Sequence, residues 1–157
     1  LIIKLGLDPT APDIHLGHSV VLRKIKQMQD LGHRAVIIIG DFTGKIGDPT
    51  GKAKGRVALT DEEVIENAKT YEKQIFKVLD REKTEVVFNS EWLSKLSFDT
   101  VLKLAASTTV ERDDIQKRYN NNVAIGLHEF FYPLMQAWDS VQIKAATTRA
   151  PIAQKKF

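Results

Sequence analysis

The chain has 157 residues, of which 43% are apolar and 27% charged, and these values are ordinary for a water-soluble globular domain. It contains no cysteine, which excludes disulfide bonds, thiolate nucleophiles and cysteine-ligated zinc sites. The net charge is +3, but the basic residues are scattered, so they permit a nucleic-acid partner without indicating one. No apolar run approaches the roughly 18 residues that span a bilayer, and no signal peptide leads the chain. We therefore expect a soluble, cytoplasmic protein of one domain or part of one.

The start of the chain has the pattern of a strand, a helix and a second strand. An apolar run covers residues 1–8, and an unbroken β-branched run over 33–41 is typical of a strand buried on both faces of a parallel sheet. Between them, apolar residues from Val21 to Leu31 recur at helical spacing, and Gly32 is placed to end that helix. Such a βαβ unit is expected to cross over right-handed.

A second helix and a third strand follow. Residues 60–80 begin with a capping box formed by Thr60 and Glu63 and continue with an apolar stripe at helical spacing. Residues 85–88 are a plausible third strand, and short helices are predicted from residue 89 onward. The alternation predicts an α/β fold.

The loop after the first predicted strand contains the first candidate site. Ligands of open parallel sheets bind beyond the carboxyl ends of the strands, where Asp8 lies. His15 and His18 stand at the entry to the helix, whose N-terminus suits phosphate, and Gly17 between them allows close approach to the backbone. The two imidazoles could donate hydrogen bonds to phosphate oxygens. Alternatively, the histidines are a helix cap and a surface residue, or a metal-binding pair, although no third ligand is obvious.

The second candidate is a glycine-rich loop after the second predicted strand. Residues 40–52 (GDFTGKIGDPTGK) contain four glycines, two aspartates and two lysines, a composition that suggests an anion-binding cradle. The loop differs from a P-loop because Gly47 is one residue too close to the following Gly-Lys and because Ala53 replaces the magnesium-binding hydroxyl. The alternative is a flexible connecting loop.

The third candidate is the predicted helix that contains YPLMQAWD (132–139). Tyr132, Gln136 and Asp139 fall within about 60° of one another on one helix face. The opposite face is apolar and consists of Phe130, Leu134, Trp138 and Val141. Taken alone, this pattern is that of an ordinary amphipathic helix whose polar face meets water.

Together, the three segments resemble a known family. HLGH after GLDPTAPDI, then GDFTGKIGDPTGK and later YPLMQAWDS are similar to the catalytic domain of class I aminoacyl-tRNA synthetases, specifically bacterial tyrosyl-tRNA synthetase. HLGH is a variant of the His-Ile-Gly-His signature of that class. The resemblance implies a Rossmann-like parallel sheet whose first half covers 1–88, a helical insertion with the amino-acid-binding helix over 89–145, and a tail over 146–157 that departs from the family.

The resemblance also implies a reaction. Such an enzyme activates L-tyrosine with ATP and Mg²⁺ to tyrosyl-adenylate and transfers the tyrosyl group to tRNA(Tyr), with no metal bound by the protein itself. The implied catalytic residues are Thr10, His15 and His18, of which Thr10 and His15 would hold the terminal phosphates. The implied ATP-binding residues are Gly6, Asp8, Thr10, His15, Gly17 and His18.

Four residues are implied for tyrosine. Asp48 would receive the α-amino group, with Tyr132 and Gln136 beside it, and Asp139 would accept a hydrogen bond from the phenol hydroxyl. The resemblance further implies a homodimer formed through the helical insertion, and no contact with membranes.

The sequence departs from the family in several places. Lys4 stands where many relatives have an aromatic residue, although one bacterial branch resembles this sequence. A few residues are missing between Val110 and Glu111, and after Ala145 the chain lacks the Gly-Gly-Thr-Asp-Gln segment, the Lys-Met-Ser-Lys-Ser loop and an anticodon-binding domain. We therefore interpret the chain as a fragment or an engineered minimal form that is weakly active or inactive by itself. The alternatives are another nucleotide-binding enzyme, P-loop-like or adenylate-forming, and a non-catalytic dimerising module.

Overall fold

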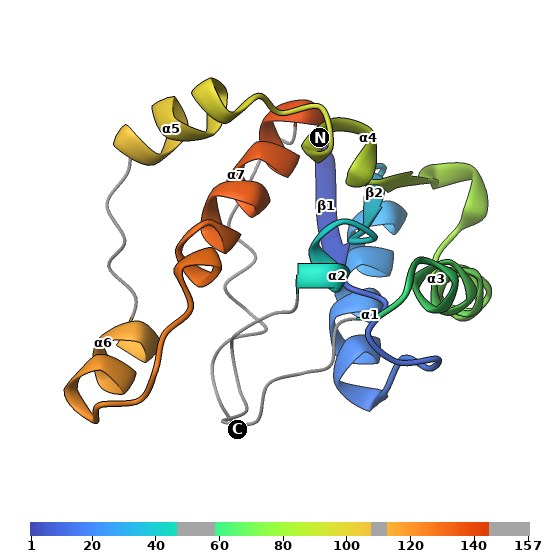
Figure 1. Cartoon of the computed structure of the whole chain (residues 1–157). Coiled ribbons are helices and arrows are strands. Elements are labelled where there is room, and N and C mark those ends of the chain that lie inside the picture. The colour runs from blue at the N-terminus through green and yellow to red at the C-terminus, as the bar shows by residue number, and fades with distance from the viewer. Residues whose placement is uncertain (47–58, 108–112, 145–157) are drawn as a thin grey trace.

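The computed structural model describes residues 1–46, 59–107 and 113–144 of the chain. The described strands form a parallel sheet in the order β1-β2-β3, with β1 at Ile2–Leu7, β2 at Arg34–Ile39 and β3 at Thr84–Phe88 (Figure 1). The helices between them along the chain are α1 (Leu16–Asp30), α2 (Thr43–Ile46), α3 (Asp61–Ile75) and the short 3-10 helix η1 (Arg81–Lys83). The predicted α/β fold with a parallel sheet is confirmed.

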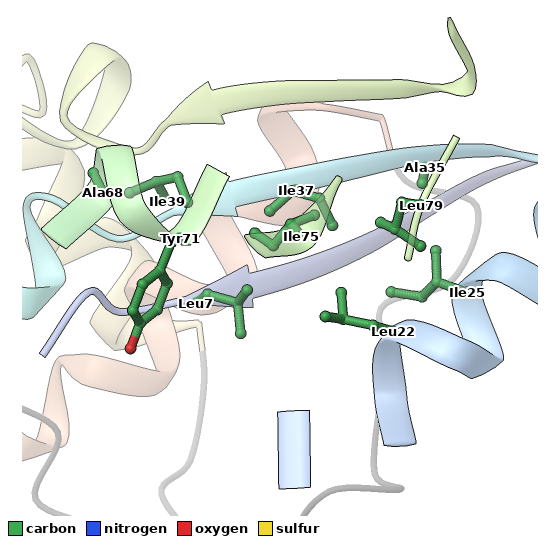
Figure 2. Close-up of a cluster of buried hydrophobic side chains, with 10 residues drawn as sticks. All are labelled: Leu7, Leu22, Ile25, Ala35, Ile37, Ile39, Ala68, Tyr71, Ile75 and Leu79. Carbon is green, nitrogen blue, oxygen red and sulfur yellow. The ribbon is translucent and has the colours of Figure 1, made fainter. Parts of the chain in front are cut away.

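Helices α1 and α3 cover one face of the sheet, and the main hydrophobic core lies between them and the strands (Figure 2). This core contains Leu7, Leu22, Ile25, Ala35, Ile37, Ile39, Ala68, Tyr71, Ile75 and Leu79. Both helices lie on the same face because both crossovers run in the same direction along the sheet and share one hand.

The opposite face of the sheet meets helix α7 (Tyr132–Gln142). Side chains alternate along a strand, so Lys4 and its register partner Val36 point away from α1 and α3. The Lys4 amine donates to the main-chain carbonyl of Gln136, 2.9 Å away, which places α7 beside β1 on this second face (Figure 1). Strand β2 is therefore buried on both faces, as its β-branched sequence predicted.

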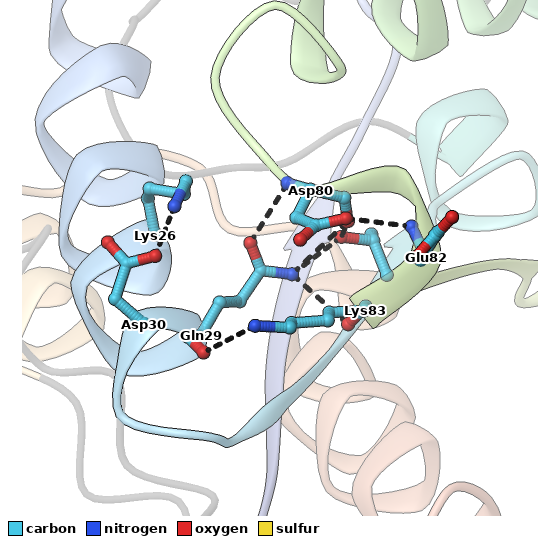
Figure 3. Close-up of polar contacts among 7 residues, drawn as sticks. Lys26, Gln29, Asp30, Asp80, Glu82 and Lys83 are labelled. Carbon is cyan, nitrogen blue, oxygen red and sulfur yellow. Dashed lines mark hydrogen bonds and ion pairs between the residues drawn. The ribbon is translucent and has the colours of Figure 1, made fainter.

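The end of α1 differs in one respect from the sequence-based prediction. Gly32 has a φ of +88°, the left-handed conformation that suits glycine after a helix. Leu31, which was expected to continue the apolar stripe, is 77% exposed because it lies beyond the last helical residue. Gln29 is buried instead. Its amide accepts from the Asp80 main-chain N–H at 3.1 Å and donates to the Thr84 hydroxyl at 2.8 Å, which ties α1 to the turn before β3 (Figure 3).

Helix α3 begins as predicted and ends earlier. The Thr60 hydroxyl accepts from the Glu63 main-chain N–H at 3.2 Å, and the Glu63 carboxylate accepts from the Thr60 N–H at 2.8 Å, so the capping box is confirmed. The helix ends at Ile75, and Leu79 still reaches the core from the turn that follows.

The described elements after β3 are all helical, as the sequence predicted. They are α4 (Ser90–Leu93), α5 (Phe98–Ala106), α6 (Asp113–Asn120), the 3-10 helix η2 (Leu127–Phe130) and α7. Helices α5 and α6 lie on the side of α7 away from the sheet (Figure 1). Arg118 of α6 pairs with the buried carboxylate of Glu129 in η2, which joins these two elements. None of the described helices is both long and apolar enough to cross a membrane.

Helix α7 is oriented differently from the expectation for a simple amphipathic helix. Asp139 is only 6% exposed, whereas Val141 of the expected apolar face is 60% exposed. Gln136 on the same face is exposed, so the interpretation of that face as solvated is wrong only for Asp139. The buried Asp139 carboxylate accepts a hydrogen bond from the indole N–H of Trp92 in α4.

Shortening a buried side chain of the central strand tests this account of the core. Ile37 is fully buried, so Ile37→Ala should lower the free energy of unfolding by about 2–5 kcal/mol in a urea titration. Ile65 of α3 is 55% exposed and is a matched control, for which Ile65→Ala should change stability by no more than about 0.5 kcal/mol. Equal losses would contradict the placement of the core on β2.

Candidate active site

Two histidines cap the N-terminus of α1. His15 is the N-cap residue, and its Nδ1 accepts from the Gly17 main-chain N–H at 3.1 Å. The Nδ1 of His18 accepts in turn from the His15 main-chain N–H at 3.1 Å. The two rings lie 4.0 Å apart between centroids. The pair thus forms a reciprocal capping box, and the interpretation of His15 as a helix cap is correct.

This capping arrangement sets the tautomer of each neutral ring. A ring nitrogen that accepts a hydrogen bond is unprotonated, so each neutral imidazole carries its proton on Nε2. Burial lowers the pKa of His18, and a positive charge on nearby His15 would lower it further, which favours the neutral form. Capping therefore leaves each ring with an Nε2–H donor at the positive end of a helix dipole.

Gly17 and Gly6 have different surroundings. A Cβ atom added to Gly17 would lie 2.9 Å from the His15 ring, so glycine is required there by the capping geometry itself. A Cβ atom at Gly6 would meet no other described atom within 4 Å, and Gly6 is exposed on the face of β1 that α7 covers. The surface above Gly6 therefore has room for a ligand.

Asp8 is the centre of a polar network at the carboxyl ends of the strands. Its Oδ1 accepts from the Thr43 hydroxyl at 2.6 Å, and its Oδ2 accepts from the Tyr132 hydroxyl of α7. Asn89, which follows β3, donates to the Thr43 hydroxyl at 3.1 Å. A Cβ atom at Gly40 would clash with both the Asp8 carboxylate and the Thr43 hydroxyl, which explains the glycine there. The ends of all three described strands thus meet at this network.

A second carboxylate, that of Asp139 on α7, is buried. The Asp139 Oδ1 accepts from the Trp92 indole N–H at 2.8 Å. Burial raises the pKa of Asp139, while the Trp92 hydrogen bond and the positive charge of Lys4 oppose that rise. Burial likewise lowers the pKa of Lys4, and the Asp139 charge opposes it. Each of these two groups therefore helps to keep the other ionised.

The glycine-rich loop is described only in part. Thr43 is committed to the Asp8 network, and Lys45 pairs with Asp61 at 2.7 Å. The first half of the expected anion cradle is therefore bound to protein groups. Asp48 and the rest of that segment lie outside the described residues.

Thr10 and Gln136 are the remaining predicted site residues. The Thr10 main-chain N–H donates to the Asp8 carbonyl at 2.8 Å, in the turn between β1 and the histidines. Gln136 is exposed at its side chain and binds Lys4 through its carbonyl. Within the described ranges, His, Cys, Asp and Glu side chains form no group of three that could hold a metal ion.

Sequence reasoning missed several residues of this region. Asn89 and Trp92 bind Thr43 and Asp139, and no short motif announces either residue. One signal was available for Asn89, because a polar residue directly after a predicted strand lies at the ligand-binding edge of a parallel sheet.

Comparison with known proteins shows the family of the chain. The family profile described as class I tRNA synthetases for tryptophan and tyrosine (W and Y) matches residues 1–150. The chain belongs to this family. The resemblance that the three motifs indicated is thus confirmed, and the curated relatives are named for the tyrosine branch.

Two curated relatives illustrate the similarity. The chain is 66% identical over 149 residues to tyrosine–tRNA ligase 2 of Clostridium acetobutylicum, which covers 92% of this chain and 37% of that protein. It is 64% identical over 147 residues to tyrosine–tRNA ligase of Carboxydothermus hydrogenoformans, covering 91% and 36%. The chain thus spans little more than a third of the length of the curated relatives it matches.

Solved structures show the same fold. A C-terminally truncated mitochondrial tyrosyl-tRNA synthetase of Aspergillus nidulans superposes with a TM-score of 0.77 at 26% identity, covering 90% of this chain and 45% of that one. Tyrosyl-tRNA synthetase of Archaeoglobus fulgidus, complexed with L-tyrosine, superposes with a TM-score of 0.67 at 27% identity, covering 92% and 44%.

The histidine cap makes stability depend on pH. Because the pKa of His18 in the folded chain lies below its ordinary value of 6.5, the unfolded chain binds a proton more readily. The stabilising contribution is present above pH 6.5 and is lost as the pH falls through the lowered folded value. We expect the melting temperature to fall on acidification below pH 6.5. The melting temperature of the His18→Gln variant, which keeps a capping acceptor, should fall less over the same pH range. His33→Gln is the control and should follow the wild type, and an unchanged profile in His18→Gln would contradict the assignment.

Proposed function

We propose that this chain is the ATP- and tyrosine-binding part of a tyrosine–tRNA ligase. The observation that carries the proposal is the contact of Tyr132 with Asp8, because it joins helix α7 to the carboxyl end of β1. The proposed amino-acid helix and the proposed nucleotide edge therefore lie next to each other. The reaction requires this proximity, since the tyrosine carboxylate must meet the α-phosphorus of ATP.

The proposed chemistry needs no enzyme nucleophile. The tyrosine carboxylate attacks the α-phosphorus of ATP, which is bound with Mg²⁺, and pyrophosphate leaves as tyrosyl-adenylate forms. The tyrosyl group then passes to tRNA(Tyr), and AMP leaves. The protein supplies position and charge stabilisation, which are the main contributions in phosphoryl-centre chemistry.

The proposed ATP site is the entry to α1. We assign the terminal phosphate contacts to Thr10 and to the Nε2–H group of His15, which lies at a helix N-terminus. Gly17 and His18 are assigned to the adenosine side, and the room above Gly6 supports close approach of ATP.

The proposed tyrosine site lies on α7 and the adjoining loop. We assign the α-amino group to Asp48, Tyr132 and Gln136, and the phenol hydroxyl to Asp139. A carboxylate has about four lone-pair positions, so the hydrogen bonds from Trp92 and Asn89 leave Asp139 able to accept another. Lys4 supports this role because its charge favours the ionised carboxylate.

Exchange of labelled pyrophosphate into ATP tests the function. The measurement is made on a protein of the relatives' full length that contains this sequence, called here the full-length form. Exchange that depends on tyrosine supports the proposal. Exchange that depends on another amino acid, or none at all, refutes it in favour of a different nucleotide-binding enzyme or a non-catalytic module.

The role of Asp139 gives a sharper prediction. Asp139→Ala in the full-length form should reduce tyrosine activation by roughly 10- to 100-fold more than phenylalanine activation, since a hydrogen bond to a charged group contributes about 1.5–3 kcal/mol. The neighbouring Ser140 is also buried, and its hydroxyl donates to the Gln136 carbonyl at 3.1 Å. Ser140→Ala is the matched control and should affect both amino acids alike. Equal losses in Asp139→Ala would mean that Asp139 supports only the fold.

We also propose that the helical region forms a homodimer. Several large apolar side chains of residues 98–141 are exposed, namely Phe98, Leu102, Tyr119, Val123, Leu127 and Val141. A second copy that covered these side chains would remove their apolar surface from water. The proposed partner is a second copy, in line with the domain division at residue 89 that we propose for the chain.

The dimer proposal predicts a shift in mass. Leu127 is 75% exposed, so Leu127→Asp should convert the dimer to a monomer in sedimentation equilibrium by burying an unpaired charge at the interface. Leu31→Asp, at the residue that follows α1, is a control of similar exposure (77%) that should leave the mass unchanged. A monomeric wild type, or a dimeric Leu127→Asp variant, would contradict the proposed interface.

A further inference from the structure

Polar side chains on one face of α3 hold the loop that leads to the histidines. The Asn67 amide donates to the Pro9 carbonyl at 3.0 Å, and the Thr70 hydroxyl donates to the Pro12 carbonyl. These residues and Gln74 stand three and four positions apart, so they share one side of the helix.

Gln74 binds the two residues that directly precede His15. Its Oε1 accepts from the Ile14 main-chain N–H at 2.9 Å, and its Nε2 donates to the Asp13 carboxylate at 2.6 Å. Ile14 directly precedes His15, so this hydrogen bond sets the position at which the capping pair begins. The ring of Tyr71, on the same helix, also meets the edge of the His18 ring at a centroid distance of 6.4 Å.

We propose that Gln74 is a positioning residue for adenylate formation. It acts by holding His15 in the place from which that histidine binds the phosphates. This inference rests on the proposed function, because it assigns Gln74 to the same site. The histidine rings are oriented by main-chain N–H groups of their own turn, so a displacement of Ile14 displaces the whole capping box. A displacement of about 1 Å in a donor to the transition state can reduce a rate by about 100-fold. Binding of ATP in the ground state depends less on exact geometry, so we expect the affinity for ATP to change less than the rate.

Another glutamine provides a matched control. Gln29 is buried and also binds a loop through its amide. It joins the end of α1 to the turn before β3 (Figure 3), at the amino end of that strand and so away from the candidate site. Gln→Met at either position removes the amide while keeping the length of the side chain. Both variants should lose stability, and only Gln74→Met should lose rate.

The test measures tyrosine-dependent pyrophosphate exchange in the full-length form over a range of ATP concentrations. Gln74→Met should lower kcat by about 10- to 100-fold with little change in the KM for ATP. Gln29→Met should lower the melting temperature and keep kcat. In a His15→Ala background, Gln74→Met should add little further loss, because both substitutions remove the same contribution.

A charge exchange tests the same contact without loss of packing. Gln74→Glu keeps the acceptor for Ile14 but places two carboxylates together, whereas Asp13→Asn/Gln74→Glu restores a donor and an acceptor across the pair. The double variant should recover most of the kcat that Gln74→Glu loses, and this comparison decides the question even if Gln74→Met does not fold.

The outcomes separate the two proposals. A wild type without tyrosine-dependent exchange overturns the proposed function, and the role of Gln74 in it falls as well. An active wild type with unchanged kcat in Gln74→Met, additive losses with His15→Ala, or no recovery in the charge exchange overturns the positioning role alone.

Discussion

The carboxylate of Asp8 is the interaction on which the arrangement of the site depends. It lies at the end of β1 and accepts hydrogen bonds from Thr43 after β2 and from Tyr132 on α7, while Asn89 after β3 binds the same Thr43 hydroxyl. One acidic group thus connects the strand ends with a helix more than a hundred residues away in the chain. Because an ionised carboxylate forms stronger hydrogen bonds than a neutral acceptor, it can hold separate segments in one geometry.

The histidine pair shows how structural and chemical roles can reside in the same side chains. Capping occupies Nδ1 of both rings and so leaves the Nε2–H groups as donors at the positive end of α1. The interpretation as a helix cap and the interpretation as a phosphate site are therefore compatible. A capping role also orients the rings before any ligand arrives, which reduces the entropy that must be lost in the transition state.

Burial on α7 gives the second carboxylate a different character. Asp139 is removed from water, and its charge is supported by the Trp92 indole and by Lys4 on the face of the sheet that α7 covers. In the proposed tyrosine site, a phenol hydroxyl would donate a further hydrogen bond to this carboxylate, and an unsubstituted ring would not. This is the physical basis on which a tyrosine site can distinguish a phenol from an unsubstituted ring.

The sequence by itself determined the strands, the two long helices, the capping box of Thr60 and Glu63 and the family, because periodicity, capping and motif order are local properties of the chain. Only the tertiary structure decided which polar groups meet. Leu31 is exposed and Gln29 buried because α1 ends between them, and Asp139 is buried where the Trp92 indole N–H can donate to it. The contact of Gln74 with Ile14 spans 60 residues. A polar residue on a helix has the same local pattern whether water or a loop satisfies it, so its partner follows only from how the helices pack.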